Sequence, residues 1–432
     1  MSAGVVTPVY LDYHATTPVD PRVFEAMRPW LEGGAAGLFG NPASRQHAFG
    51  ERASRAVETA RGQVAALVGV EPDEVIFTSG ATESINLAIK GMFLPRGPGR
   101  AQGRLVTSVV EHRAALDPAK RLMRQGVDVV WLRVDPLGHV SLSDLVQAVE
   151  DGTRLVSLLL ANNEIGTIAS AREISEVCRR VGVALHWDAS QAAGHVASGE
   201  PAWGGDLVSL SAHKLCGPQG IGALVVRKRE PSLRLTPLIE GGGHEQHLRS
   251  GTVPVALAVG FGVAAELARR ERVMESRRLA ELRDRLWRRL RAGLGCGEGT
   301  AGQASSGTSS RGSGTPVNSS GPLVNSSTSV PDDRLILRNG DPDRALPGNL
   351  NISVGGVDGD RLLAALTEIA VSSGAACSSS NPEPSHVLRA IGRSEALAKA
   401  SLRFGLGRFT TEAEVDFAAD AVIRTVQRLR SA

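Results

Sequence analysis

Residues 207–220 read LVSLSAHKLCGPQG, and this stretch decides the fold because a strand-like run, Leu207–Leu210, leads directly to Lys214. Strand-like runs and helical patterns alternate along the chain around it. The other runs are Val75–Phe77, Arg104–Val109, Val127–Leu132, Leu155–Leu160, Val183–Trp187 and Ala223–Val226, and the helical patterns are Glu83–Lys90, Asp117–Gln125 and Ala171–Val181. Strands separated by helices form βαβ units, so the sequence predicts an α/β protein with a mainly parallel, seven-stranded sheet.

Ligands of such sheets bind on the loops at the carboxyl ends of the strands. Lys214 lies on one of these loops, beside Ser211 and His213, whose side chains could donate hydrogen bonds to a phosphate. Taken alone, a lysine at a strand end is typically a plain surface residue. A lysine that bonds a carbonyl cofactor also needs a pocket that lowers its pKa. The interpretation of Lys214 therefore depends on the neighbouring loops.

Asp188 follows the run Val183–Trp187 at the next strand end. An aspartate in this position is often the N-cap of the following helix. The alternative is a carboxylate that keeps the pyridine nitrogen of pyridoxal phosphate protonated, so that the ring can act as an electron sink. In that case Gln191 could reach the ring hydroxyl.

Three further strand-end loops carry polar groups. The loop Thr78–Ser84 places small residues at a helix start, where backbone N–H groups attract an anion, although a capping box from Ser79 to Glu83 is the structural alternative. His112 could stack on a cofactor ring and relay protons, whereas a lone histidine is more often structural. Amides in Asn162–Gly166 could bind a ring oxygen or a substrate carboxylate.

Composition indicates a soluble globular protein. The chain has 432 residues, which suggests two domains, and a net charge of +3, which gives no reason to expect nucleic acid or membrane partners. The N-terminus lacks a secretory or transit pattern, and no stretch has the length and apolarity of a membrane span. Four isolated cysteines fit a reducing compartment, and we expect a cytoplasmic location and no metal site.

The pattern changes in the second half of the chain. Long helices are predicted over Val255–Leu294, and the arginine-rich stretch Arg283–Arg291 is interpreted as a solvated helix face rather than a nucleic-acid patch. A Gly/Ser/Thr-rich segment follows, which is predicted to be a disordered insertion at about 295–330. A second, smaller domain is then indicated by a strand, a helix and a closing amphipathic helix, over Asn349–Val354, Leu362–Val371 and Glu412–Leu429.

Taken together, these loops make the chain resemble a cysteine desulfurase of the NifS/IscS group, in the class-V pyridoxal-phosphate aminotransferase-like family. The resemblance spans about residues 11–430, apart from the insertion. It rests on Leu11–Asp20, Gly40–Ser44, the loops around Gly80 and Asn163, Asp188–Gln191, Ser211–Gly217, Gly241–Glu245, Arg249–Thr252 and Ser372–His386.

The resemblance implies a pyridoxal 5'-phosphate enzyme of fold type I, which is aspartate-aminotransferase-like, with a large α/β domain and a smaller α+β domain. It implies that residues 1–20 pack with the small domain, that 21–263 bind the cofactor, and that 264–432 form the small domain with the catalytic cysteine loop. Lys214 would bond the cofactor, with further contacts from Ala81, Thr82, His112, Asn163, Asp188, Gln191, Ser211, His213 and Thr252.

The resemblance also implies roles in substrate chemistry. Arg403, Asn163 and Asn41 would bind L-cysteine, with the planar guanidinium of Arg403 on the carboxylate. Lys214 would move the Cα proton, His112 would relay protons, and Cys377 would take the sulfur as a persulfide. Cys377 could also transiently ligate an iron–sulfur cluster. Cys216 follows Lys214 closely, and it is given no role.

The partners implied are a second copy of the chain, reached by Thr252, and a sulfur acceptor or iron–sulfur scaffold protein. The chain lacks the long tail that follows the last helix in some relatives, which argues against scaffold docking through such a tail. Two alternatives stay open within the family, a selenocysteine lyase and a plain class-V aminotransferase, and Cys377 argues against the second. A non-catalytic sulfur carrier is a third alternative, which the set of Lys214, Asp188 and His112 argues against.

Overall fold

The large sheet contains the seven strands that the sequence predicts, in the order β2-β8-β7-β6-β5-β3-β4. The computed structural model describes residues 5–34, 37–95, 99–295, 336–373 and 383–431. Only β8 runs antiparallel to its neighbours in this sheet, β2 and β7. The strands are β2 (Val75–Thr78), β3 (Arg104–Ser108), β4 (Asp128–Leu132), β5 (Thr153–Leu159), β6 (Ala184–Asp188), β7 (Leu207–Ser211) and β8 (Gly222–Val226).

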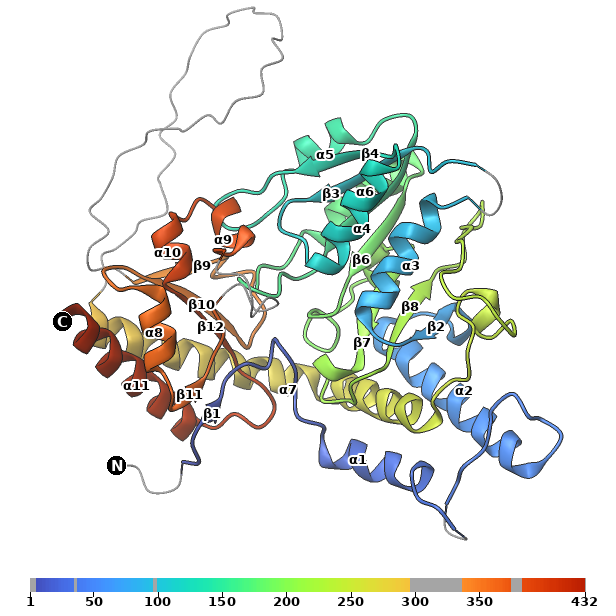
Figure 1. Cartoon of the computed structure of the whole chain (residues 1–432), viewed down its shortest axis with the longest axis horizontal. Coiled ribbons are helices and arrows are strands. Elements are labelled where there is room, and N and C mark those ends of the chain that lie inside the picture. Colours follow the sequence, from blue (N-terminus) through green and yellow to red (C-terminus); the bar gives the residue numbers. More distant parts are fainter. Residues whose placement is uncertain (1–4, 35–36, 96–98, 296–335, 374–382, 432) are drawn as a thin grey trace, which may run out of the picture.

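Helices cover both faces of this sheet, as Figure 1 shows. One face packs on α3 and α4, and the other packs on α2, α5, α6 and the first half of α7. The central strands β6 and β7 are therefore buried along their whole length, which explains why their sequences, ALHWD and LVSLS, are mostly apolar. The helices are α1 (Pro21–Met27), α2 (Ala48–Val68), α3 (Ala81–Phe93), α4 (Arg113–Arg124), α5 (Leu142–Ala148), α6 (Ala171–Val181) and α7 (Val255–Leu294).

A second core lies beside a three-stranded antiparallel sheet with the order β12-β10-β9. The short strand β1 pairs in parallel with β11, so the N-terminal segment joins this part of the molecule. The proposed domain boundaries stay a prediction. The elements here are β1 (Val9–Tyr10), β9 (Ile336–Asn339), β10 (Asn349–Val354), α8 (Gly359–Ala365), β11 (Ile369–Ala370), α9 (His386–Ala390), α10 (Glu395–Lys399), β12 (Ser401–Gly405) and α11 (Glu412–Ser431).

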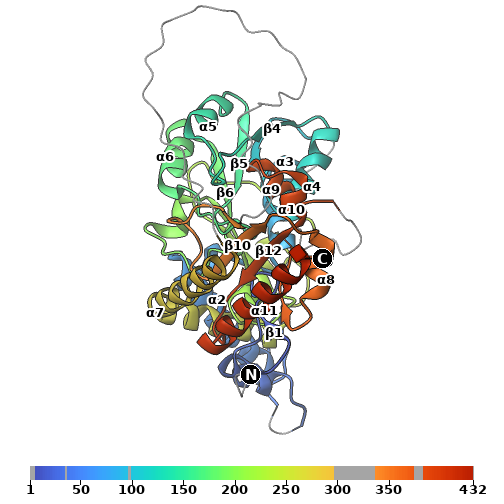
Figure 2. The same cartoon turned by 90° about the vertical axis from the view of Figure 1, so that its left-hand side faces the viewer.

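The helix α7 links the two cores. Its first half contributes Phe261 to the core of the large sheet, and its second half contributes Leu286 to the core around β10. Figure 2 shows α7 and α11 lying side by side below the smaller sheet. The predicted long helical region is thus one continuous helix, and it passes through the predicted domain boundary at 263.

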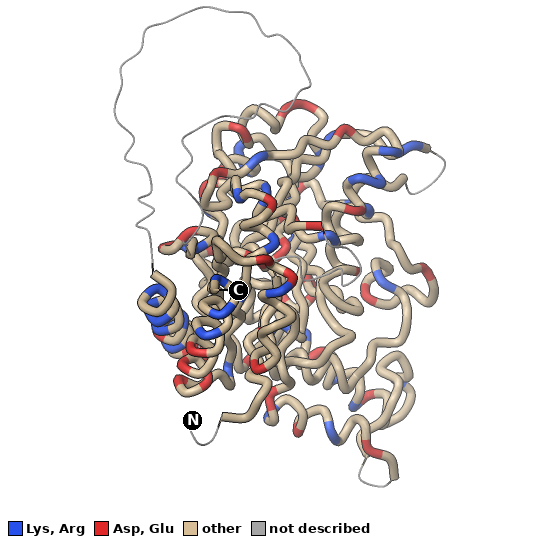
Figure 3. The backbone as a smooth tube through the Cα atoms, turned by 60° about the vertical axis from the view of Figure 1, so that its left-hand side comes forward, with Lys and Arg blue, Asp and Glu red and all other residues tan. Residues whose placement is uncertain are grey.

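The arginine-rich part of α7 is bound to acidic residues. Arg285 Nη2 lies 2.7 Å from Asp416 on α11, and Arg289 Nη2 lies 2.7 Å from Asp420 on the same helix. Figure 3 shows the basic positions of α7 beside acidic positions of the neighbouring helix. These ion pairs favour the interpretation as a solvated helix face. In the described ranges of the chain, no helix is both long and apolar enough to cross a bilayer.

One predicted element differs from the structure. The sequence predicts a helix over Leu362–Val371, but α8 begins three residues earlier, at Gly359, and ends at Ala365. Asp358 caps this helix through Arg361 N–H, and Ile369–Ala370 then form β11 against β1. The helix prediction was therefore wrong at its C-terminal end, because pairing with a distant strand outweighed the local pattern. The predicted insertion falls almost entirely on 296–335, outside the described residues.

Candidate active site

The carboxyl ends of the central strands border a cavity of about 510 Å3. This volume is in the usual range for a site that binds a small molecule. Strand-end loops and β12 contribute its walls. The cavity brings together most of the residues predicted to bind cofactor or substrate, namely Ala81, Thr82, His112, Asn163, Asp188, Gln191, Ser211, His213, Lys214 and Arg403.

The turn between β2 and α3 presents a helix N-terminus to this cavity. Gly80 is the N-cap, with a φ of 154° that favours glycine, and it provides no side-chain cap. Glu83 instead accepts a hydrogen bond from Ser79 N–H at 2.7 Å, which is only half of the capping box that the sequence offers as the structural alternative. A Cβ on Gly222 would lie 2.7 Å from Gly80 Cα, so glycine at 222 keeps this turn close to β8. The arrangement suits an anion.

Asp188 ends β6 with only 3% of its surface exposed. Its Oδ1 accepts hydrogen bonds from the backbone N–H and the hydroxyl of Ser190. The segment after it forms turns rather than a regular helix, so Asp188 does not serve as a helix N-cap. A carboxylate fixed in this way at the cavity wall can accept a hydrogen bond from a protonated ring nitrogen.

His112 both caps a helix, as a structural histidine would, and lines the cavity, as a cofactor-binding histidine would. Its side chain caps α4, because Nδ1 accepts a hydrogen bond from Ala114 N–H at 3.1 Å. In the neutral ring, the proton is therefore on Nε2. The ring also lines the cavity, so the capping contact fixes both its tautomer and its place beside a bound ligand.

Lys214 lies in a short 3-10 turn that follows β7. Its Nζ donates hydrogen bonds to the main-chain carbonyls of His14 and Ala15, the second at 2.8 Å. Beside it, His213 Nδ1 lies 3.0 Å from Thr16 Oγ1, and burial lowers the pKa of His213 to about 4. The N-terminal segment therefore covers the loop that carries the lysine.

Arg403 reaches the cavity from β12, on the smaller sheet. Its side chain is 1% exposed, and its Nη2 lies 2.8 Å from Asp12. Its Nη1 donates to the backbone carbonyl of Asn163 at 3.0 Å. The guanidinium is thus held in place by two separate segments, with its Nε buried and without a partner in the described part of the chain.

Two of the predicted residues, Asn41 and Thr252, do not line this cavity. Asn41 is exposed, and its Oδ1 accepts a hydrogen bond from Ala43 N–H. Thr252 is exposed just before α7. Cys377, the predicted sulfur acceptor, lies outside the described residues. The proposed roles of these three residues stay predictions.

Two buried glutamates beside the cavity received no role from the sequence. Burial raises the pKa of Glu111 to about 8, and burial raises the pKa of Glu164 to about 7. Ser108 donates to Glu111, and Ser385 donates to Glu164. The only sequence signal was their position at strand ends, next to His112 and Asn163.

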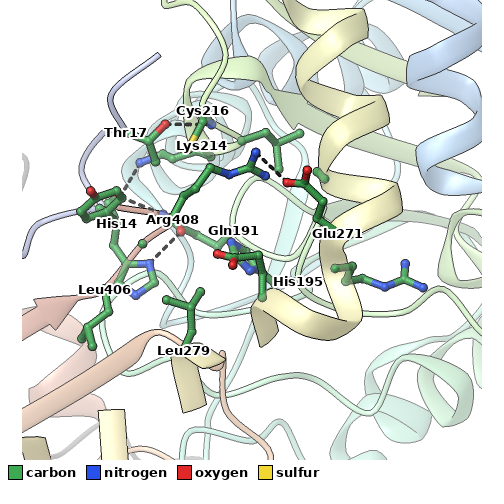
Figure 4. A pocket seen from close by; sticks show the side chains of 17 residues that line it. His14, Thr17, Gln191, His195, Lys214, Cys216, Glu271, Leu279, Leu406 and Arg408 are labelled. Atoms are coloured by element: carbon green, nitrogen blue, oxygen red, sulfur yellow. Dashed lines mark hydrogen bonds and ion pairs between the residues drawn. The ribbon is translucent and has the colours of Figure 1, made fainter. Parts of the chain in front are cut away.

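His14 was also missed as a separate residue, although it lies in the stretch Leu11–Asp20 that carries the resemblance. It borders the main cavity and a second cavity, which is shown in Figure 4. In the second cavity Arg408 lies 2.8 Å from Glu271, and Cys216 N–H donates to Thr17. Burial raises the pKa of the Cys216 thiol, which disfavours its thiolate.

Within the described ranges, no group of three or more His, Cys, Asp or Glu side chains could hold a metal ion. The two described cysteines, Cys178 and Cys216, are free and buried. The main cavity itself is lined by a lysine, a carboxylate, a neutral histidine and a helix N-terminus. This set matches the requirements of a phosphorylated carbonyl cofactor with a basic ring nitrogen.

Comparison with known proteins agrees with this geometry. The aminotransferase class-V family matches residues 9–305, and the chain belongs to this family. It is 44% identical to the cysteine desulfurase IscS of Aeromonas hydrophila subsp. hydrophila, over 98% of this chain and 94% of that protein. It is 43% identical to a mitochondrial cysteine desulfurase of Arthroderma benhamiae, over 98% of this chain and 75% of that protein. Within the family, the chain thus groups with the cysteine desulfurases.

Solved structures lead to the same grouping. A NifS-like protein is 31% identical with a TM-score of 0.80, and the match covers 98% of this chain and 100% of that one. A structure described as SspA in complex with cysteine is 31% identical with a TM-score of 0.72, covering 93% of this chain and 100% of that one. The expected fold, the aspartate-aminotransferase-like type I, is confirmed.

Proposed function

We propose that this cysteine desulfurase holds pyridoxal 5'-phosphate on Lys214 and passes the sulfur of L-cysteine to Cys377. The observation that carries the proposal is the meeting of Lys214, Asp188 and the N-terminus of α3 at one cavity. Each of these features has an ordinary structural explanation when it stands alone. Their convergence provides an amine, a ring-nitrogen acceptor and an anion site together.

The residues present fit this cofactor. The N-terminus of α3 would hold the phosphate, with Thr82, Ser211 and His213 beside it. Asp188 would pair the ring nitrogen, and His112 would lie on the ring. Gly222 supports the fit, since any side chain there would press on Gly80 in the phosphate turn. When bound, the cofactor supplies an electron sink for the electrons released at Cα of the substrate.

By the family resemblance, Gln191 would reach the ring hydroxyl of the cofactor. In the structure, both ends of the Gln191 side-chain amide contact His14. Gln191 Nε2 donates to the His14 carbonyl at 2.9 Å, and Gln191 Oε1 lies 3.0 Å from His14 Nδ1. We retain Gln191 as a cofactor-site residue and propose that it acts mainly by holding His14 at the cavity wall.

Arg403 would bind the carboxylate of L-cysteine. Its guanidinium is oriented by Asp12 and by the carbonyl of Asn163, and its Nε has no partner among the described residues of the cavity wall. A fixed planar fork suits a carboxylate because two parallel hydrogen bonds can form. Asn163 would assist from the same wall. Asn41 does not line this cavity, so Asn41 would have to approach the substrate from outside the cavity wall.

Lys214 would then remove the Cα proton of the substrate, and His112 would hold a proton at Nε2 for the later steps. The Cys377 thiolate forms a sulfur–sulfur bond with the substrate while the substrate's Cβ–S bond breaks. The electron pair of that bond goes to Cβ, which takes up a proton. The products are L-alanine and a Cys377 persulfide, so atoms and electrons balance.

The proposal includes a homodimer, in which Thr252 reaches the phosphate of the neighbouring subunit. Its support is that Thr252 is exposed and lies away from the cavity of its own chain. The persulfide would pass to a sulfur-acceptor or iron–sulfur scaffold protein. We propose a cytoplasmic site of action, which the sparse and isolated cysteines favour.

Product analysis tests the proposed function. Purified protein with bound cofactor should convert L-cysteine to equal amounts of alanine and sulfide in the presence of a thiol reductant. A selenocysteine lyase would instead act on L-selenocysteine and spare L-cysteine. A plain aminotransferase would require a 2-oxo acid and would yield no sulfide. Failure to form alanine from L-cysteine would refute the proposal.

A further inference from the structure

His14 carries a buried nitrogen that has no role in the chemistry described so far. The residue is 8% exposed, and its Nε2 is buried without a hydrogen-bond partner among the residues that the structure describes. A buried polar atom that is left unpaired is costly, so it usually has a partner in the working protein. The ring lines the proposed substrate cavity together with Lys214 and Arg403.

The protonation of this ring follows from Gln191. Gln191 Nε2 donates to the His14 carbonyl at 2.9 Å, which fixes the orientation of the amide. Gln191 Oε1 then faces His14 Nδ1 at 3.0 Å, and because an amide oxygen can only accept, Nδ1 must carry the proton. In the neutral ring, Nε2 therefore has a free lone pair and acts as an acceptor.

The charges around the ring keep it neutral. Burial lowers the pKa of His14 to about 3, and the nearby positive charges of Arg403 and Lys214 act in the same direction. A nitrogen with so low a pKa is too weak a base to take a proton from an alkylammonium group. It can, however, accept a hydrogen bond from one.

The same corner of the cavity already binds an ammonium group. Lys214 Nζ donates to the main-chain carbonyls of His14 and Ala15, and Figure 4 shows His14 and Gln191 close to Lys214. The acceptors of the N-terminal segment thus face the cavity. After burial, the positive charge of Arg403, the proposed carboxylate ligand, is the largest cause of the lowered pKa of His14.

We propose that His14 Nε2 accepts a hydrogen bond from the ammonium group of the amino-acid substrate, while Arg403 binds its carboxylate. The inference rests on the proposed function and adds the residue that binds the amino group of the substrate. In an α-amino acid the ammonium and carboxylate groups are attached to one carbon, so their ligands must lie at one site, and Arg403 and His14 line the same cavity. His14 thereby selects an amino acid over a thiol acid that lacks the amine.

Kinetics of two variants of the cofactor-loaded protein test this role. His14→Leu removes the acceptor, and we expect the KM for L-cysteine to rise about tenfold with kcat changed less than about twofold. His14→Gln retains an acceptor oxygen and should recover most of the affinity. Inhibition by 3-mercaptopropionate, which has no amine, should be the same in His14→Leu as in the parent.

Two results would overturn the assignment. One is an unchanged KM in His14→Leu, and the other is an equal loss of affinity for L-cysteine and 3-mercaptopropionate, which would indicate a packing role. If His14→Leu fails to fold, the nitrogen-15 resonance of His14 in the parent protein decides. Nε2 should be unprotonated near neutral pH and should shift when L-alanine is added, whereas a protonated Nε2 contradicts the inference. A parent protein that makes no alanine from L-cysteine refutes the proposed function instead, and it leaves the resonance measurement valid.

Discussion

Lys214 Nζ donates a hydrogen bond to the main-chain carbonyl of Ala15, 2.8 Å away and 199 positions earlier in the chain. The contact joins the loop after β7 to the segment that follows β1, and β1 itself pairs with β11 of the C-terminal part. Arg403 of β12 closes the same cavity. The proposed site is therefore assembled from both sheets.

Lys214→Ala should abolish turnover because the variant lacks the amine that bonds the cofactor and moves the Cα proton. We expect added cofactor to bind non-covalently, since Asp188 and the α3 N-terminus remain. Borohydride reduction followed by peptide mapping provides the measurement. In the parent protein the cofactor should be fixed to the peptide that contains Lys214, and labelling of a different lysine would contradict the assignment.

Gly222→Ala should weaken cofactor binding. The new Cβ would lie 2.5 Å from the Leu210 carbonyl oxygen and 2.7 Å from the backbone of Gly80, so the phosphate turn must move. We expect the dissociation constant of the cofactor to rise by about tenfold or more, which corresponds to the loss of about one charge-assisted hydrogen bond. Titration of the cofactor-free protein, followed by absorbance, measures this change.

Gly62→Ala is the matched control for Gly222→Ala. Gly62 lies within α2, and a Cβ at this position would meet no atom within 4 Å. The substitution should leave cofactor affinity unchanged and should stabilise the protein by about 0.5–1 kcal/mol, because alanine favours a helix over glycine. Equal loss of cofactor affinity in both variants would show that the effect is not specific to the phosphate turn.

Glu111→Gln should change the pH dependence of stability. Burial raises the pKa of Glu111 from 4.5 to about 8, so the folded protein binds this proton more tightly than the unfolded chain does. The resulting stabilisation is complete below pH 4.5 and is lost as pH rises toward 8. The neutral glutamine removes this loss, and the variant should gain stability relative to the parent as pH rises.

Denaturant unfolding at about pH 5 and about pH 9 measures the effect of Glu111→Gln. The stability difference between variant and parent should grow by a few kcal/mol over this interval. Glu173→Gln on α6 is a control at an exposed carboxylate. A difference that stays constant with pH in Glu111→Gln would mean that Glu111 is ionised in the folded protein throughout.

Deletion of residues 295–330 should leave the turnover of L-cysteine intact. The Gly/Ser/Thr-rich composition of this segment provides few large apolar side chains for a core, so no part of the proposed chemistry depends on it. Alanine formation by the deletion variant and the parent, at equal cofactor content, measures the effect. A large loss of turnover would show that the segment supports the site.

The large sheet could be predicted because its strands are short, mostly apolar runs bounded by polar loops. The run Val183–Trp187 overlaps β6 (Ala184–Asp188), in which every residue is buried, so the apolar composition of the run indicates a strand covered on both faces. The error at Leu362–Val371 has the opposite cause. β11 forms there only because β1 supplies a partner more than three hundred residues away, and local sequence contains no sign of this pairing.

The site could be predicted in part for the same reason. Asp188, His112 and Lys214 stand at strand ends, where parallel topology brings loops together whatever their separation in sequence. His14 lies in no such position. Its importance comes from its contacts with Gln191 and from an unpaired nitrogen, and both depend on the packing of the N-terminal segment over the large sheet.

The location of the transferred sulfur tests the account most directly. The cofactor-loaded protein is treated with L-cysteine without reductant, alkylated and analysed by peptide mass spectrometry, alongside Cys377→Ser and Cys216→Ser. The account predicts one added sulfur atom on the Cys377 peptide of the parent and of Cys216→Ser, with no persulfide and little alanine in Cys377→Ser. A persulfide on Cys216, or alanine formation by Cys377→Ser at the parent rate, would contradict it.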